Sequence, residues 1–196
     1  MKITVILGHP GKESFNHAIA TAAVEQLITA GHSVTFHDLY TEKFDPILPL
    51  DEIPKHGKVD PKIQQYCTEI VDADGLVVVH PNWWGQPPAI VKGWIDRVLR
   101  AGVAYEFVEG DNGAGLPKGL LKLRAAVIFN TSNTPGEREH TVFCDPLQLT
   151  WKNCITDLCG AKTFYRTTFS PIVDSTLEQR KKWLIEVRNV VDKQFK

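Results

Sequence analysis

The chain has 196 residues, 43% of them hydrophobic, and its 22 Lys and Arg against 23 Asp and Glu give a formal net charge of −1. This composition is typical of one globular domain with a sizeable core, and it excludes a disordered or collagen-like chain. The charge balance provides no basic field for nucleic acid and no strongly acidic face. We therefore expect a single domain over residues 1–196 that binds no nucleic acid, and the charge balance indicates no other partner.

Cysteine usage and apolar runs bear on the compartment. The four cysteines are too sparse for a disulfide scaffold, none stands in a C-x-x-C pair, and no metal-ligand spacing is present. The first apolar run, residues 3–7, is too short for a signal-peptide core, and no apolar stretch reaches the length of a membrane span. We expect a cytoplasmic protein with reduced thiols, no membrane insertion and no metal.

Strand and helix patterns alternate along the chain. Apolar or alternating runs predict strands at residues 3–7, 33–37, 75–80, 125–129 and 163–169. Helices are predicted after Ser14, from residue 61, from Pro87-Pro88 to Arg100, over residues 146–158 and over residues 177–195. In the first of these helices the apolar positions Ala18, Ala22, Leu27 and Ile28 recur at roughly helical spacing, and residues 40–58 are expected to form a long excursion.

Strands separated by helices predict a parallel sheet with helices on both faces. We expect an α/β fold of the flavodoxin-like, doubly wound type, with five parallel strands in the order 2-1-3-4-5. In such sheets a ligand binds beyond the carboxyl ends of the strands, at the point where the strand order reverses. The loops after the first, third and fourth strands are therefore the candidate site.

The first of these loops, residues 8–16, leads from an apolar strand into a helix. Ser14 is placed to cap that helix, whose first turn offers unpaired backbone N–H groups. A phosphate there would gain hydroxyl, amide and dipole interactions together. The same residues would also suit a helix that is merely capped, so this loop alone leaves both interpretations open.

The loop after the third strand contains two adjacent tryptophans and a glycine, Trp83-Trp84-Gly85. Flat aromatic faces at a ligand-binding edge suit a heteroaromatic ring, and the N–H groups of the loop suit ring heteroatoms. The alternative is that one tryptophan packs in the core and the other lies at a subunit contact.

The loop after the fourth strand, residues 130–136, is rich in hydroxyl and amide groups. Donors at this edge would stabilise the negative charge that develops on the pyrimidine side of a flavin as it is reduced. A plain turn is the alternative. The first loop lacks the three-glycine dinucleotide fingerprint and the chain lacks a Gly-Lys-Ser/Thr phosphate loop, which disfavours Rossmann dehydrogenases and nucleotide triphosphatases.

Four segments together resemble the NAD(P)H:quinone oxidoreductase family. They are Gly8-His-Pro with Ser14-Phe-Asn16, the Pro81-Asn-Trp-Trp84 loop, the PAIVKGWIDR run of residues 88–97 and the AYEF run of residues 104–107. The resemblance spans most of the chain, and PAIVKGW is its most specific part. The family includes DT-diaphorase and the ancillary flavoproteins of potassium-efflux systems, and the resemblance implies a flavodoxin-like homodimer.

The resemblance also implies roles for individual residues. The flavin phosphate is assigned to His9, Ser14, Phe15 and Asn16, the ring to Pro81, Asn82, Trp83, Trp84 and Gly85, and the pyrimidine edge to Thr131, Ser132, Asn133 and Thr134. Tyr105 and Phe107 are expected near the substrate.

The chain departs from the family at two places. Eukaryotic members carry a Gly-Gly turn followed by a Tyr and a His that help hydride transfer, whereas this chain has Ser132-Asn133 and no tyrosine downstream in that loop. We take His140 as the catalytic candidate, with Arg138 or backbone amides as the alternatives. By the resemblance, a family glutamine that meets the adenine side of FAD falls at Cys67, with Gln64 and Gln65 nearby but out of register, which favours FMN over FAD.

These patterns predict a flavin-dependent NAD(P)H:quinone oxidoreductase. By the resemblance, NAD(P)H reduces the flavin and leaves, and a quinone or related acceptor then takes two electrons in a ping-pong cycle. Two alternatives remain, a flavodoxin-type one-electron carrier, whose usual acidic surface is missing, and a regulatory flavoprotein subunit of a potassium-efflux system. The acceptor and the choice between NADH and NADPH stay open.

Overall fold

The computed structural model describes residues 1–54, 57–108 and 115–196. Five parallel strands form one sheet in the order β2-β1-β3-β6-β7. They are β1 (Lys2–Leu7), β2 (Ser33–Asp38), β3 (Gly75–Pro81), β6 (Ala125–Thr131) and β7 (Phe164–Phe169). Because β4 and β5 belong to a separate hairpin, this is the order 2-1-3-4-5 among the strands of the sheet, and the predicted flavodoxin-like α/β fold is confirmed.

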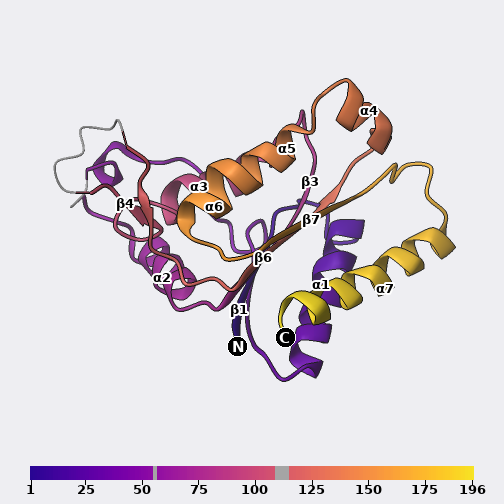
Figure 1. Cartoon of the computed structure of the whole chain (residues 1–196), viewed down its shortest axis with the longest axis horizontal. Helices are drawn as coiled ribbons and strands as arrows, with labels where there is room; N and C mark the ends of the chain where they lie inside the picture. Colours follow the sequence, from indigo (N-terminus) through magenta and orange to yellow (C-terminus); the bar gives the residue numbers. More distant parts are fainter. Residues whose placement is uncertain (55–56, 109–114) are drawn as a thin grey trace.

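Helices cover both faces of the sheet (Figure 1). One face carries α1 (Phe15–Thr29) and α7 (Leu177–Gln194), and the other carries α2 (Pro61–Val71), α3 (Ala89–Val98) and the run of α5 (Pro146–Leu149), η2 (Thr150–Thr156) and α6 (Asp157–Cys159). Alternate residues of a strand point to opposite faces, so β3 sends Val78 into one apolar cluster and Val77 and Val79 into the other. This two-sided burial explains the unbroken apolar run of β3.

The helices begin at the capping residues that the sequence offers. Ser14 caps α1, Asp60 caps α2 with Pro61 in its first turn, and Thr176 caps α7. Of the apolar positions of α1, Leu27 is buried but Ile28 is 58% exposed. Leu27 faces the sheet, and the next residue of a helix is rotated by about 100° away from it.

Short elements were not predicted. A hairpin of β4 (Tyr105–Glu106) and β5 (Lys118–Gly119), a single turn η1 (Leu50–Glu52) and the short helix α4 (Gly136–Thr141) appear where the sequence has no sustained period. The predicted helix over residues 146–158 is present, but its middle, η2, is π-helical. Such wide turns have no simple sequence signature, because they depend on how the helix packs.

The long excursion after β2 is held against α3. Arg97 donates to both carboxylate oxygens of Glu52, over 3.1 and 2.6 Å, and the two side chains are 6% and 2% exposed. A Cβ atom at Gly93 would lie 2.3 Å from the backbone of Pro46, so glycine permits this close approach. Specific contacts therefore fix the excursion against α3.

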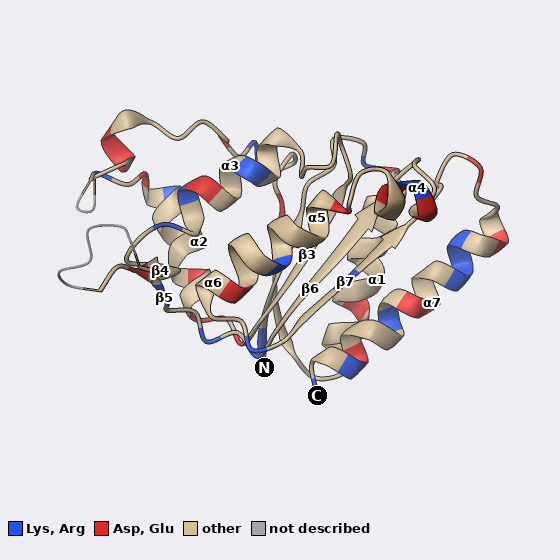
Figure 2. Ribbon diagram, turned by 45° about the horizontal axis from the view of Figure 1, so that its top comes forward, with Lys and Arg blue, Asp and Glu red and all other residues tan. Residues whose placement is uncertain are grey.

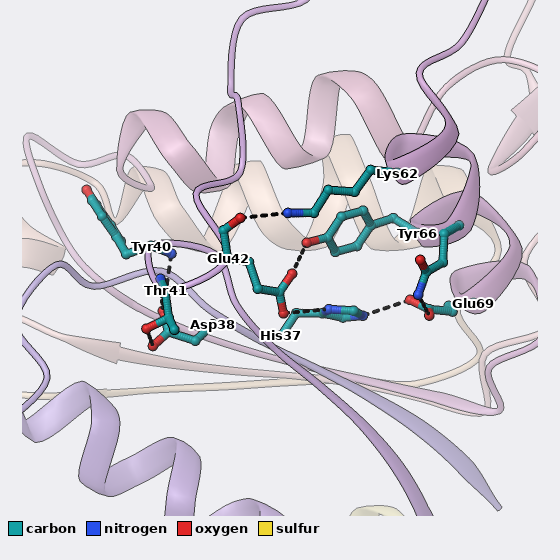
Figure 3. Close-up of polar contacts among 9 residues, drawn as sticks. His37, Asp38, Tyr40, Thr41, Glu42, Lys62, Tyr66 and Glu69 are labelled. Carbon is teal, nitrogen blue, oxygen red and sulfur yellow. Dashed lines mark hydrogen bonds and ion pairs between the residues drawn. The ribbon is translucent and has the colours of Figure 1, made fainter.

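A second polar cluster joins the start of the excursion to α2 (Figure 3). The imidazole of His37 lies between two carboxylates, 3.0 Å from Glu42 and 2.7 Å from Glu69. Tyr66 donates to Glu42, and Lys62 donates to the Glu42 carbonyl over 2.6 Å. These contacts fix the chain directly after Asp38.

Both termini lie at the end of the molecule opposite α4 (Figure 1). Within the described ranges, no helix is long and apolar enough to cross a membrane, and no cluster of three or more His, Cys, Asp or Glu side chains is arranged to hold a metal ion. The edge where β1, β3 and β6 end is left for the candidate site.

Candidate functional site

The loop from β1 to α1 presents polar groups around the first turn of the helix. The Ser14 hydroxyl accepts from the backbone N–H of His17 over 3.3 Å, as predicted for a cap. The ring of His9 contacts the backbone of Gly11, whose N–H donates to Nδ1 over 3.0 Å. Burial lowers the pKa of His9, and the neighbouring His17 adds to this against the contact with Gly11. His9 is therefore a neutral imidazole at this loop near pH 7.

Asn16 is the buried polar residue of the same turn. Its side chain is 3% exposed, and Nδ2 donates to Thr131 over 2.9 Å, which ties the first loop to the end of β6. Its Oδ1 is buried and has no hydrogen-bond partner among residues 1–54, 57–108 and 115–196. An unsatisfied buried polar atom costs roughly 1–3 kcal/mol. Because the side-chain amide can be turned over, one end remains free for a phosphate oxygen or a sugar hydroxyl, so this residue fits a phosphorylated flavin.

The tryptophan pair lies on a tight turn after β3. Trp83 and Gln86 exchange backbone hydrogen bonds of 3.1 and 3.0 Å, and Trp84 and Gly85 both have positive φ, +57° and +72°, as a type I′ turn requires. Trp84 is fully exposed and Trp83 is 43% exposed, with its ring 6.4 Å from that of His9. Neither ring is in the core, so one part of the alternative interpretation is wrong.

A buried carboxylate braces that turn from α4. Asn82 accepts from the N–H of Gly85 and donates to Glu139, both over 2.9 Å, and Glu139 is 6% exposed. Pro81, the last residue of β3, is buried beside them. Sequence reasoning missed Glu139 in favour of its neighbour His140, and no signal in the loop distinguishes the two before the direction of α4 is known.

The turn after β6 is closed by its own side chains. Thr131 is buried at the strand end, and the Ser132 hydroxyl accepts from the N–H of Thr134 over 3.0 Å. Asn133 is exposed and its Oδ1 accepts from Val173 over 3.0 Å. The Ser132 side chain is therefore used within the loop and the Asn133 side chain binds the segment after β7, which leaves Thr134 as the side chain of this turn that lines open space.

A polar layer supports these loops from below. His80 is fully buried, its Nδ1 lies 2.8 Å from the carbonyl of Pro81 and its Nε2 accepts from the indole of Trp151 over 2.9 Å. Burial lowers the pKa of His80 to about 4, so it is neutral and structural. Arg166 of β7 is paired with Asp145. These hydrogen bonds hold the loops above them in place. From periodicity alone, the side chains that make them are expected only to be part of the core.

Two cavities open at this edge, and Thr134 and Glu139 line both. One, of about 490 Å³, is bounded by the tryptophan turn, Phe143 and Pro146. The other, of about 480 Å³, is polar and includes His140, whose side chain is 68% exposed and lies 3.6 Å from Asp145. Both volumes are in the range of small-molecule sites.

The two predicted substrate residues lie elsewhere in this chain. Tyr105 and Phe107 pack edge to face with centroids 5.8 Å apart on the β4 side of the molecule. They line a third cavity of about 540 Å³, which shares no lining residue with the two cavities at the sheet edge. The predicted cofactor residues are thus gathered at one edge, and the predicted substrate aromatics are not joined to them.

The parallel sheet and the loops at its edge define a flavodoxin-like protein. A model of the family described as having a flavodoxin-like fold matches residues 1–189.

Known proteins narrow this class. The chain is 38% identical over 134 residues to an uncharacterized NAD(P)H oxidoreductase of Haemophilus influenzae. This match covers 67% of the chain but only 64% of that relative. It is 30% identical over 206 residues to ribosyldihydronicotinamide dehydrogenase (quinone) of Rattus norvegicus, covering 92% of this chain and 86% of that protein. Among solved structures, Smu.1420 of Streptococcus mutans is 30% identical, with a TM-score of 0.83 over 97% of this chain and 98% of that one. The chain belongs to the NAD(P)H:quinone oxidoreductase family of flavodoxin-like proteins.

Proposed function

We propose that this chain binds FMN across the loops that follow β1, β3 and β6, oxidises NAD(P)H and reduces a quinone-like acceptor in a ping-pong cycle. The observation that carries the proposal is the meeting at one edge of an unsatisfied buried amide at a helix N-terminus, an exposed tryptophan pair and a polar turn. A bound flavin would supply the chemistry, which is hydride acceptance and two-electron delivery. The names of the relatives, a reduced-nicotinamide oxidoreductase and a quinone dehydrogenase, support it.

In this proposal the residues of the chain bind and orient. The first turn of α1, with Ser14 and His9, holds the phosphate through N–H and O–H donors. The indoles of the tryptophan turn cover the ring, and backbone donors of the turn after β6 face its pyrimidine edge. His140 lines the polar cavity next to Thr134, from which its imidazole would donate to the bound ligand.

The structure supports FMN rather than FAD at one position. Cys67 stands where the family places a glutamine toward adenine, and it is 2% exposed with its Sγ directed to the Val98 carbonyl over 3.7 Å. A buried thiol offers no contact to a second nucleotide. An azoreductase of Bacillus anthracis, which has the same fold at 14% identity and a TM-score of 0.75 over 98% of this chain and 99% of that one, was solved in complex with FMN.

The proposal includes a homodimer. Large apolar side chains are exposed around the β4 side of the molecule, among them Leu50 (79%), Ile53 (62%), Phe107 (52%) and Leu116 (89%). Aromatic and apolar residues of this kind are enriched in interface cores. A second copy would explain how Tyr105 and Phe107 reach a substrate although they are separate from the cofactor loops of their own chain. Light scattering of the purified protein tests this, and a monomer at micromolar concentration would rule it out.

An absorption spectrum of purified protein, soaked with FMN or FAD and then mixed with NADPH without oxygen, tests the function. A yellow protein that bleaches and is reoxidised by a quinone supports the proposal, and mass spectrometry of the released cofactor identifies it. A flavin that NAD(P)H leaves oxidised contradicts it and favours the carrier or the regulatory subunit. Acidic and basic residues are interspersed along α7 (Figure 2), and with a formal net charge of −1 the chain lacks the acidic excess typical of a carrier.

A further inference from the structure

His17, at the third position of α1, makes contacts through both ring nitrogens. Its Nδ1 lies 2.9 Å from the Ser14 hydroxyl and its Nε2 lies 3.2 Å from a carboxylate oxygen of Asp38. Capping boxes place Glu or Gln at this helix position and return it to the backbone N–H of the cap residue. Here an imidazole reaches the cap hydroxyl instead. The result is a chain of hydrogen bonds from Asp38 through His17 to Ser14, at the loop assigned to the phosphate.

Asp38 is held in place at the end of β2. It accepts from the backbone N–H groups of Tyr40 and Thr41, each over 3.1 Å, and from the Thr41 hydroxyl over 2.6 Å (Figure 3). Burial opposes its ionisation, but the hydrogen bonds from Thr41 and His17 outweigh burial and lower the pKa of Asp38. An ionised carboxylate only accepts hydrogen bonds, so Nε2 of His17 carries a proton. Nδ1 of His17 is therefore the ring atom that is able either to accept from or to donate to the Ser14 hydroxyl.

The proton at Nδ1 decides what the Ser14 hydroxyl can offer. Without it, Nδ1 accepts the O–H of Ser14, and that hydroxyl has no proton left for a ligand. With it, Nδ1 donates to Ser14, the hydroxyl hydrogen turns outward, and the ring is positively charged. A phosphate dianion at the helix N-terminus favours the second state through both the hydrogen bond and the charge.

Among the titratable groups near Ser14, His17 is the one placed to carry a positive charge toward a bound phosphate. In the described part of the chain, the titratable groups in contact with its ring are Asp38 and His9, whose ring centroid is 6.2 Å away. Burial, more than the proximity of His17, lowers the pKa of His9, so His9 does not supply the positive charge. The buried, unsatisfied Oδ1 of Asn16 in the same turn is an independent sign that this N-terminus is built for a ligand.

We propose that His17 couples phosphate binding to protonation, so that one proton is taken up at Nδ1 when the flavin phosphate binds at Ser14. The inference rests on the proposed function, because it takes a phosphorylated flavin as the ligand. It predicts that affinity for FMN falls as pH rises, whereas affinity for riboflavin, which has no phosphate, does not. His17 is thus a positioning residue that acts through the Ser14 hydroxyl.

The test compares the Kd of FMN and of riboflavin by flavin fluorescence quenching from pH 7 to pH 8.5. In this range the FMN phosphate is a dianion, because its second pKa is about 6. Uptake of one proton makes the ratio of the FMN Kd to the riboflavin Kd rise by up to about tenfold per pH unit. Calorimetry in two buffers of different ionisation enthalpy should report up to one proton bound with FMN and none with riboflavin.

Three variants, one of them a control, assign the pH dependence of FMN binding to His17. His17→Gln should abolish the pH dependence of the ratio and weaken FMN at pH 7 toward its wild-type value at pH 8.5. The matched control His32→Gln removes an imidazole that lies beyond the other end of α1, against the N-terminal amine, and should keep the wild-type slope. Asp38→Asn removes the carboxylate that fixes the proton on Nε2 and should reduce the slope.

The inference and the function fail in different ways. A constant ratio in the wild-type protein, or a wild-type slope in His17→Gln, overturns the inference while FMN binding keeps the proposed function intact. If neither FMN nor riboflavin binds at any pH, the proposed function falls and the inference falls with it. The wild-type titration and calorimetry decide the matter even if a variant fails to fold.

Discussion

Asn16 tests whether the first turn of α1 is a ligand site or only a capped helix. Its Oδ1 is buried without a partner, which costs roughly 1–3 kcal/mol, and its bond to Thr131 contributes about 0.5–1.5 kcal/mol. Asn16→Leu removes both and leaves the Thr131 hydroxyl unpaired, so the terms offset. We expect the free energy of unfolding of the ligand-free protein to change by no more than about 1 kcal/mol. Adding Thr131→Val removes the stranded hydroxyl, and the double variant should be more stable than Asn16→Leu by about 1 kcal/mol.

The same substitution should damage binding. The loss of a hydrogen bond to a charged phosphate is worth about 1.5–3 kcal/mol, so the Kd of FMN for Asn16→Leu should rise roughly 10–100-fold. Urea denaturation followed by far-ultraviolet circular dichroism measures the stability, and flavin fluorescence quenching measures the affinity. If Asn16→Leu loses 2 kcal/mol or more of stability while FMN affinity is unchanged, the residue serves the helix alone, and the reasoning is refuted.

Four further variants test the buried ion pair, the tryptophan turn and two residues of α4. Glu52→Gln breaks its buried pair with Arg97 and should cost about 3–5 kcal/mol in urea denaturation. The bond from Arg97 lowers the pKa of Glu52 against the effect of burial, so this stabilisation is present above the unfolded-state value of about 4.3 and is lost as pH falls through the lower folded-state pKa. Glu52→Gln should therefore show a shallower loss of stability in acid than the wild type. Trp84→Ala should change stability by less than about 0.5 kcal/mol but weaken FMN about tenfold, since stacking is worth roughly 1–3 kcal/mol. Glu139→Gln removes a buried charge beside the proposed ring and should raise the flavin potential by roughly 30 mV in a redox titration, whereas His140→Ala should slow NADPH oxidation about tenfold. An unshifted flavin potential in Glu139→Gln would remove Glu139 from the site, and an unchanged rate of NADPH oxidation in His140→Ala would remove His140 from it.

The main elements of the fold were predictable because burial on two faces leaves a strong mark. β3 and β6 are apolar along nearly their whole length, and α3 has a clear stripe of Ile90, Trp94 and Val98. The two-residue strands β4 and β5 were not, since no periodicity exists at that length. The π-helical turn η2 was missed for a related reason, because Trp151 within it is positioned by its bond to His80, which the sequence does not show.

The site was predictable as loops but not as contacts. Because parallel strands end at the same edge, the loops after β1, β3 and β6 had to meet. Asn16 is bonded to Thr131, the rings of His9 and Trp83 lie 6.4 Å apart, and Trp84 and Thr134 line one cavity. Glu139 is 57 positions from Asn82, and Asp38 is 21 positions from His17, so neither pair is visible without the fold. Such contacts depend on where α4 begins and where β2 ends, which local propensity fixes only to within a few residues.

The charges at this edge of the sheet differ between the first turn of α1 and the region near α4, and this difference favours one orientation of a bound ligand. At the first turn of α1, the helix dipole favours an anion, and the proton uptake proposed for His17 would add to this. Near α4 the buried charges are the carboxylates of Glu139 and Asp145, and Arg166 is committed to Asp145 and to three neighbouring side chains. A phosphate placed there would face the buried Glu139 carboxylate, while Arg138 of α4 is exposed to solvent, whereas an uncharged ring meets no such repulsion. We therefore expect a ligand with a phosphate at one end and a neutral ring at the other to bind in one orientation, with its ring against the exposed tryptophans.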